Sequence, residues 1–356
     1  MNIQVIRKST QGKDEVEIVY STQKARQSMS IDYKTFLGAL TEDESSSTPQ
    51  KIVEPLLNVS EGNFIAQTEA PVNDADLSQL NKFNDFLLEN LGNDIKTLHE
   101  AEPDLIFTIE SSEHYILSLP WELLFEDKMD SFRMTRRVSG GLQPQEATRH
   151  NYLVLLSHSF FDGLKELPNL ASDFYSELQP ILESLLENNR KGENKPQLFS
   201  VVKYVSPEVI SKLDIDECDN LHLIMHGREN GALGFEDPSD YSRIAWLDPQ
   251  EFIDKFKSSK PFNFIFLSCC YSGYGDMRNA SLAYKLVQAG VCNYVVAFNG
   301  SVGSEKTLPM FAKEFYKQYM VNGSVQESFH RAFKLLAELQ KPYWYRPVLY
   351  ARGSYE

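Results

Sequence analysis

Residues 263–273 read Asn263-Phe-Ile-Phe-Leu-Ser-Cys-Cys-Tyr-Ser-Gly273. A short apolar run is followed here by small polar residues, two cysteines and a glycine, which is the pattern of a buried strand that ends in a turn. Tyr152–Leu156, Leu221–Met225 and Tyr294–Phe298 are apolar runs of the same kind. Because a strand of a parallel sheet is covered on both faces, we expect the four runs to form the centre of one such sheet.

Segments with helical patterns separate these runs. They cover Leu170–Leu186, Ser206–Leu213 and Ala280–Gln288, and one further strand is expected at Leu198–Val205. Strands that alternate with helices predict an α/β fold, with a mostly parallel sheet and helices on both of its faces. In such a sheet, ligands bind beyond the carboxyl ends of the strands, so functional residues are to be sought there.

The 356 residues are enough for about two domains. We expect a small α+β accessory or regulatory region over residues 1–70, a segment over 71–150 that leads into the core, and the α/β core over 151–356. In the first region, Ile3–Arg7 and Glu15–Tyr20 alternate like half-buried strands.

The middle segment combines three patterns. Residues 74–91 have helical periodicity. Asp104–Glu110 and His114–Leu119 resemble the two strands of a hairpin, and Pro120 is then placed to open a short helix.

Charge and cysteine usage narrow the class of protein. The chain carries 35 Lys and Arg against 50 Asp and Glu, a formal net charge of −15, which disfavours a direct nucleic-acid partner. No apolar run reaches the roughly 18 residues of a membrane span, and the N-terminus lacks the apolar segment of a signal peptide. The four cysteines all follow residue 217 and provide no disulfide framework across the chain. We therefore expect a cytoplasmic protein with no membrane partner.

Two strand ends carry candidate catalytic residues. His226 and Gly227 follow one predicted strand, and Cys269 and Cys270 follow the next. An imidazole beside a thiol can take its proton and make a nucleophilic thiolate. The N–H groups of Gly227 and Cys270 could form an oxyanion hole, and a helix expected within a few residues of Cys270 would favour the thiolate by its N-terminal field.

Other interpretations of these residues stay open. A cysteine at a strand end is often a small apolar filler, and a lone histidine is often a core residue. A metal site is disfavoured, because His222 and His226 would stand about 13 Å apart on a strand. Cys292 cannot join a common zinc site, because it begins the following strand, at the opposite edge of the sheet. No Walker A or Gly-x-Gly-x-x-Gly pattern follows a strand.

Several motifs occur together in a fixed order along the chain. They are Leu119-Pro-Trp-Glu-Leu-Leu124, His226-Gly227, Leu267-Ser-Cys-Cys-Tyr-Ser-Gly273, residues 280–290, Phe315-Tyr316, residues 322–327 and residues 343–353. Over roughly residues 75–353 the sequence thereby resembles the CHAT domain family, the caspase-like and separase-like cysteine peptidases of clan CD. The resemblance implies a caspase-like sheet.

The resemblance also implies an activity and its residues. The chain is similar to cysteine endopeptidases that cleave proteins through a His226–Cys270 dyad and a thioester, without a metal or organic cofactor. Register against the family motif selects Cys270 as the nucleophile, which leaves Cys269 as buried packing. Implied partners are a protein substrate and an activating protein or assembly, and implied settings are prokaryotic antiviral defence or cell death.

Two alternatives belong to other functional classes. One is a catalytically silent CHAT-like interaction module, against which the presence of both dyad residues speaks. The other is a hydrolase or acyltransferase that uses the same dyad on a non-peptide substrate.

Loop carboxylates at the same sheet edge are candidates for substrate binding. They are Asp162, Asp276 and Glu305, each of which could equally be a solvated loop residue. Because separase-like relatives prefer a basic residue before the cut, the resemblance predicts selection of Arg or Lys. We place Asp162 first and Asp276 second as the residue that binds it.

Overall fold

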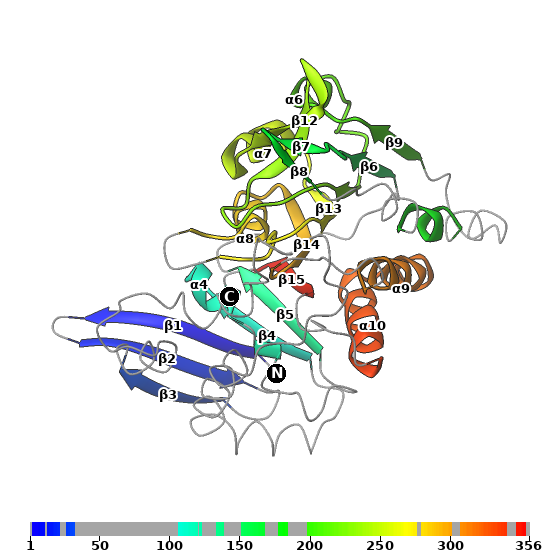
Figure 1. Cartoon of the computed structure of the whole chain (residues 1–356). Coiled ribbons are helices and arrows are strands. Elements are labelled where there is room, and N and C mark those ends of the chain that lie inside the picture. Colours follow the sequence, from blue (N-terminus) through cyan, green and yellow to red (C-terminus); the bar gives the residue numbers. More distant parts are fainter. Residues whose placement is uncertain are drawn as a thin grey trace.

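The computed structural model describes residues 2–10, 13–21, 26–32, 106–119, 121–122, 133–138, 151–167, 177–183, 198–275, 279–300, 307–339 and 347–353. The helix predicted over residues 74–91 lies outside these ranges. Within them, the strands form one 11-stranded sheet and one four-stranded sheet (Figure 1). The large sheet contains β1 (Asn2–Thr10), β2 (Lys13–Ser21), β3 (Arg26–Asp32), β4 (Ile106–Ser111), β5 (Arg133–Val138), β6 (Tyr152–Leu156), β9 (Phe199–Lys203), β10 (Asn220–Ile224), β13 (Phe262–Ser268), β14 (Cys292–Phe298) and β15 (Pro347–Arg352).

Five neighbouring strands form the parallel centre of the large sheet. Their order is β9-β6-β10-β13-β14, and each adjacent pair is parallel. Every residue of β6, β10 and β13 is buried, as expected for strands that are covered on both faces. On the other side of β14, β15 is antiparallel to it, and β5 and β4 continue the sheet in parallel. The predicted α/β fold with a mostly parallel sheet is confirmed.

The N-terminal strands extend the same sheet. β1 and β2 form an antiparallel hairpin at the two segments predicted to be strands, and β3 pairs with β2. β1 in turn pairs in parallel with β4, through Asn2 and Thr108 among others. β1, β2 and β3 therefore belong to the sheet that also contains the predicted core, whereas the boundary at residue 70 stays a prediction.

The predicted hairpin over residues 104–119 is wrong in its second half. β4 forms as predicted, but the next element is the helix α4 (His114–Ser118), in which the N–H of Leu117 donates to Glu113 O. Tyr115, Ile116 and Leu117 are all buried. A short run that is apolar on every side has no periodicity by which to distinguish a buried helix turn from a buried strand.

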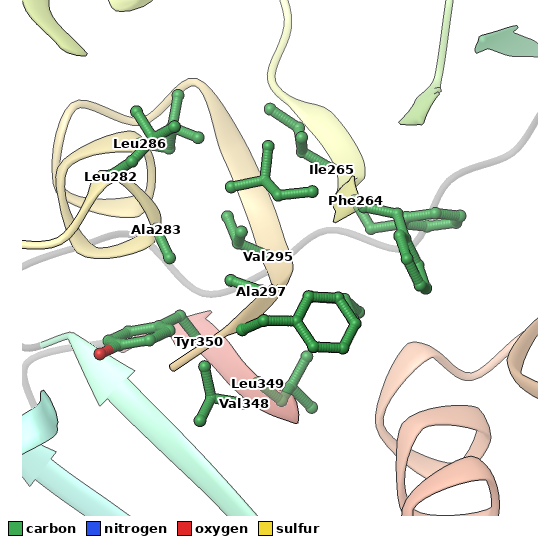
Figure 2. Packing of buried hydrophobic residues seen from close by; sticks show 14 of the residues in the cluster. Phe264, Ile265, Leu282, Ala283, Leu286, Val295, Ala297, Val348, Leu349 and Tyr350 are labelled. Atoms are coloured by element: carbon green, nitrogen blue, oxygen red, sulfur yellow. The ribbon is translucent and has the colours of Figure 1, made fainter. Parts of the chain in front are cut away.

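Helices cover both faces of the parallel centre. The described helices after α4 are a segment over residues 177–183, α6 (Pro207–Ile210), α7 (Pro249–Phe256), α8 (Leu282–Gln288), α9 (Thr307–Asn322) and α10 (Val325–Glu338). Figure 2 shows α8 beside β14 on one face, whereas Phe264 lies on the opposite side of the strands. Its ring is 5.4 Å from that of Phe315 in α9. None of the helices in the described ranges is long and apolar enough to cross a lipid bilayer.

The four-stranded sheet was not predicted. It consists of β11 (Leu233–Asp237), β12 (Asp240–Leu247), β7 (Phe161–Asp162) and β8 (Lys165–Glu166), in that order. β7 and β8 follow β6, and β11 and β12 follow β10. The small sheet thus joins the segments that leave two neighbouring strands of the large sheet, through the pairing of Arg243 with Phe161.

A buried histidine makes the stability of this fold depend on pH. His330 of α10 contacts the Met134 carbonyl of β5 at 2.9 Å through Nε2, and burial lowers its pKa to about 4. The unfolded chain protonates this imidazole near pH 6.5, so stability is complete above that pH and is lost as pH falls toward 4. We expect the free energy of unfolding to fall by about 3 kcal/mol between pH 7 and pH 4 through this residue.

Urea denaturation at several pH values measures this dependence. In His330→Gln, an amide can still donate to the Met134 carbonyl but does not titrate, so the slope between pH 6.5 and 4 should shrink. Equal slopes in the wild type and the variant would contradict the assignment.

Candidate active site

The candidate site lies at the carboxyl edge of the parallel sheet, next to the point where its connections diverge. From β6 the chain passes to β9 on one side, and from β10 it passes to β13 on the other. Such a switch point leaves a crevice beyond the carboxyl ends of the two strands. His226 follows β10 and Cys270 follows β13, and these two strands are parallel neighbours with Leu223 opposite Leu267. The two predicted dyad residues therefore leave the sheet at the same edge.

Gly227 brings the histidine segment against the cysteine. A Cβ atom added to Gly227 would overlap the carbonyl oxygen of Cys270 and would lie 3.2 Å from the Cys270 nitrogen. Only glycine permits this approach, because any side chain would displace one of the two segments. His226 is therefore one residue from a backbone contact with Cys270.

The backbone pairing of Gly227 also orients its N–H group. Gly227 is bridged to Leu233, and the flanking bonds run from the Arg228 N–H to Ala232 O and from the Gly234 N–H to His226 O. In an antiparallel ladder this is the arrangement of a pair without mutual hydrogen bonds, in which the N–H groups point away from the partner strand. The Gly227 N–H therefore points away from the strand that contains Leu233, which leaves it available as a donor to a bound oxyanion.

A tight turn holds Cys270 in place. Tyr271 has a φ of 57°, a left-handed conformation that is unusual for a residue with a side chain, and its N–H donates to Gly300 O at 2.8 Å. Ser272 Oγ donates to Cys269 O at 3.0 Å and accepts from the Phe298 N–H at 3.1 Å. Backbone strain of this kind persists where the surroundings fix it, and it is concentrated at functional sites.

The four cysteines, all of which the structure describes, differ in exposure. Cys218, Cys269 and Cys292 are buried, whereas Cys270 is partly exposed. Burial raises the pKa of Cys218 to about 11 and raises the pKa of Cys269 and Cys292 further, so these thiols stay protonated at neutral pH. Of the two adjacent thiols, Cys270 is thus the one that solvent and a substrate can reach.

The helix predicted after the cysteines, over Ala280–Gln288, forms as α8. Cys270 is followed by a turn, and α8 begins only at Leu282, with Ser281 as its N-cap. The N–H of Ala283, in the first turn of α8, donates to Ser272 O at 3.0 Å, so the N-terminus of this helix contacts the turn that holds Cys270. That the helix field favours the Cys270 thiolate stays a prediction.

Of the predicted substrate carboxylates, only Asp162 is described. Asp276 and Glu305 lie outside the described residues. Asp162 ion-pairs through Oδ2 with Arg228 Nη2, and its Oδ1 accepts from Trp246 Nε1 at 3.2 Å. The Arg228 guanidinium carbon lies 3.8 Å from the centre of the Trp246 ring. The sequence analysis did not single out Arg228 or Trp246, although Arg228 is only two residues from His226.

A second polar group that sequence reasoning missed is fully buried beneath this edge. His222 contacts Tyr316 Oη at 2.7 Å through Nδ1 and Glu177 Oε2 at 3.0 Å through Nε2. Ser268 Oγ donates to Glu177 Oε1 at 2.8 Å. This group links β10 and β13 to α9 and to the helical segment over residues 177–183, so it fixes the two strands that precede His226 and Cys270.

Comparisons with known proteins give a likeness of fold. No protein-family model and no curated protein matches the chain. A secreted C11 cysteine protease from Bacteroides thetaiotaomicron, solved with an irreversible peptide inhibitor, is 10% identical, with a TM-score of 0.35. That match covers 53% of this chain and 59% of the other, so the chain spans less than two thirds of its length.

Two further structures come from the gingipains. The Arg-specific cysteine proteinase gingipain R is 10% identical with a TM-score of 0.46, over 80% of this chain and 68% of that chain. The complex of Porphyromonas gingivalis RgpB pro- and mature domains is 10% identical with a TM-score of 0.45, over 85% and 75%. A likeness at this identity concerns the fold alone, and activity depends on the residues of the site. Membership of the CHAT family remains a prediction.

Proposed function

We propose that the chain is a cysteine peptidase in which Cys270 is the nucleophile and His226 the general base. The observation that carries the proposal is the position of Cys270. It is the one partly exposed thiol of the four, it follows a buried strand at the switch-point edge, and its backbone touches Gly227. A thiol at such a strand end, beside a segment that carries an imidazole, can act as the nucleophile in acyl transfer.

The reaction follows from these groups. The Cys270 thiol gives its proton to His226, and Sγ forms a bond to the scissile carbonyl carbon. The C–N bond then breaks, and His226 returns the proton to the leaving amine. Water, deprotonated by His226, attacks the thioester, and the S–C bond breaks to regenerate the thiol.

The Gly227 N–H is the proposed oxyanion donor, together with that of Cys270. Negative charge develops on the carbonyl oxygen in both tetrahedral steps, and fixed backbone N–H groups stabilise it without reorganisation. Support comes from the Gly227 pairing, which turns its N–H away from Leu233, and from the contact of Gly227 with the Cys270 backbone.

The finer description extends the proposal. A CHAT-type endopeptidase in the cytoplasm, switched on by a partner or assembly and acting in antiviral defence or cell death, would suit the motifs quoted above. The silent interaction module and the non-peptide hydrolase remain the alternatives. The partial exposure of Cys270 favours catalysis over a silent module, because a packing cysteine is ordinarily buried as Cys269 is.

A peptide-like thiol-reactive probe separates these functions. We expect it to label the wild type and Cys269→Ala but not Cys270→Ala, as read by intact mass. Proteome digests with and without candidate activators would then identify peptide bonds that the wild type cuts and Cys270→Ala leaves intact. A labelled protein that cuts no peptide would favour a non-peptide substrate, and an unlabelled Cys270 would favour the silent module.

A further inference from the structure

We propose that Arg228, Asp162 and Trp246 form a subsite that binds an acidic side chain of the substrate, with the Arg228 guanidinium as the recognising group. The inference rests on the proposed function and adds a substrate class to it. It replaces the basic preference that the sequence suggested, because the structure shows what Asp162 is already bound to.

The three side chains come from three elements of the small sheet and its loops. Asp162 ends β7, Trp246 lies in β12, and Arg228 lies in the segment between β10 and β11. Each contacts both others: an ion pair joins Arg228 to Asp162, a hydrogen bond joins Trp246 to Asp162, and the guanidinium stacks on the indole. A flat guanidinium held by a stack and a carboxylate has lost most of its rotamer freedom before a ligand arrives.

This subsite adjoins the dyad. Gly227 is bridged to Leu233 as in an extended ladder, so His226 and Arg228 project to the same side, about 6.6 Å apart along the chain. On the next strands, Gly234 donates to His226 O at 2.9 Å and pairs with Trp246. Arg228 therefore lies two residues from the proposed general base, on the same side of the segment, and this position is the ground for placing the subsite beside the dyad.

The hydrogen-bonding groups that the subsite still offers to a ligand are the N–H donors of a cation, Arg228. A guanidinium has five N–H donors, of which Arg228 uses one on Asp162 among the described contacts, and 45% of its side chain is exposed. Both Asp162 oxygens already accept a bond, and the carboxylate is 30% exposed. Lys165 lies opposite Asp162 in the backbone ladder of the β7–β8 hairpin. An incoming Arg or Lys would have to compete with Arg228 for Asp162, whereas a carboxylate meets the remaining donors of the guanidinium, which can bind it as a bidentate pair.

Removing the charge of Arg228 and removing the charge of Asp162 should affect peptide binding differently. The probes are acetylated, amidated peptide libraries that differ only by Asp, Gln or Arg at one fixed position, bound to the full-length Cys270→Ala protein so that nothing is cleaved. We expect the Asp library to bind about ten-fold tighter than the Arg library. Arg228→Gln should reverse this order, because it uncovers Asp162, and Asp162→Asn should keep it.

Arg331→Gln is the matched control. It removes the same charge from an exposed ion pair, with Glu327, on α10, and should leave the order unchanged. A tighter Arg library whose advantage disappears in Asp162→Asn would overturn the inference, as would equal or undetectable binding of the three libraries. If Arg331→Gln changed the binding order as much as Arg228→Gln does, the inference would also be overturned, because net charge and not the subsite would then explain the preference. Cleavage by the wild type is scored separately, so failure of the peptidase proposal leaves the binding order readable.

Discussion

Cys270→Ala should abolish peptide cleavage, and His226→Ala should lower kcat/KM by about 10³-fold or more. The first variant removes the atom that forms the thioester, and the second removes the group that takes the thiol proton and returns it to the amine. Because the two residues act as a unit, the double variant should be no slower than Cys270→Ala alone. Single-turnover assays on a peptide identified from the proteome digest measure these rates.

Cys269→Ala is the matched control for the nucleophile. It removes the adjacent sulfur, which is buried and whose pKa is raised by that burial, and so it should cleave at close to the wild-type rate. Circular dichroism verifies that all variants remain folded. Persistent cleavage by Cys270→Ala, or its loss in a folded Cys269→Ala, would show that the nucleophile has been misassigned.

The parallel centre of the sheet was predictable because its signal is local. The runs in β6, β10, β13 and β14 are apolar at most positions, and a strand buried on both faces favours that pattern over so short a length. The position of His226 and Cys270 then follows from the rule that parallel neighbours end at the same edge. This much of the candidate site needed no structure.

The surroundings of the site were not predictable in the same way. β7 and β8 have two residues each, too few to show any periodicity, and the ion pair between Asp162 and Arg228 joins residues 66 positions apart. A single carboxylate in a loop has no pattern that reveals its partner. The sequence therefore indicated Asp162 but not its ion pair with Arg228. For that reason the expected preference of the subsite changed from a basic to an acidic side chain.

The fold also depends on one buried ion pair whose loss should be the largest single effect on stability. Arg136 of β5 is fully buried and binds Glu122 through two parallel bonds, from Nη1 at 2.5 Å and from Nη2 at 2.8 Å. Its Nε donates to Leu117 O at 2.6 Å, and Nη2 also donates to Leu119 O at 2.9 Å. The same Leu117 carbonyl lies 3.3 Å from Tyr350 Oη, which is also 3.3 Å from Gly273 O in the turn after Cys270. The ion pair thus supports α4 and, through Tyr350, the turn after Cys270.

Arg136→Met should lower the free energy of unfolding by about 3–5 kcal/mol, because it leaves the Glu122 carboxylate buried without its cation. Removing the remaining charge should then restore stability: we expect Arg136→Met/Glu122→Met to unfold at a higher urea concentration than Arg136→Met alone. Lys317→Met, which breaks an exposed pair with Glu314, is the control and should change stability by no more than about 1 kcal/mol. Glu122→Met alone completes the cycle. If the decreases in unfolding free energy of the two single variants simply added in the double variant, the pair would not be coupled. The stability of α4 would then have to come from its buried apolar residues instead.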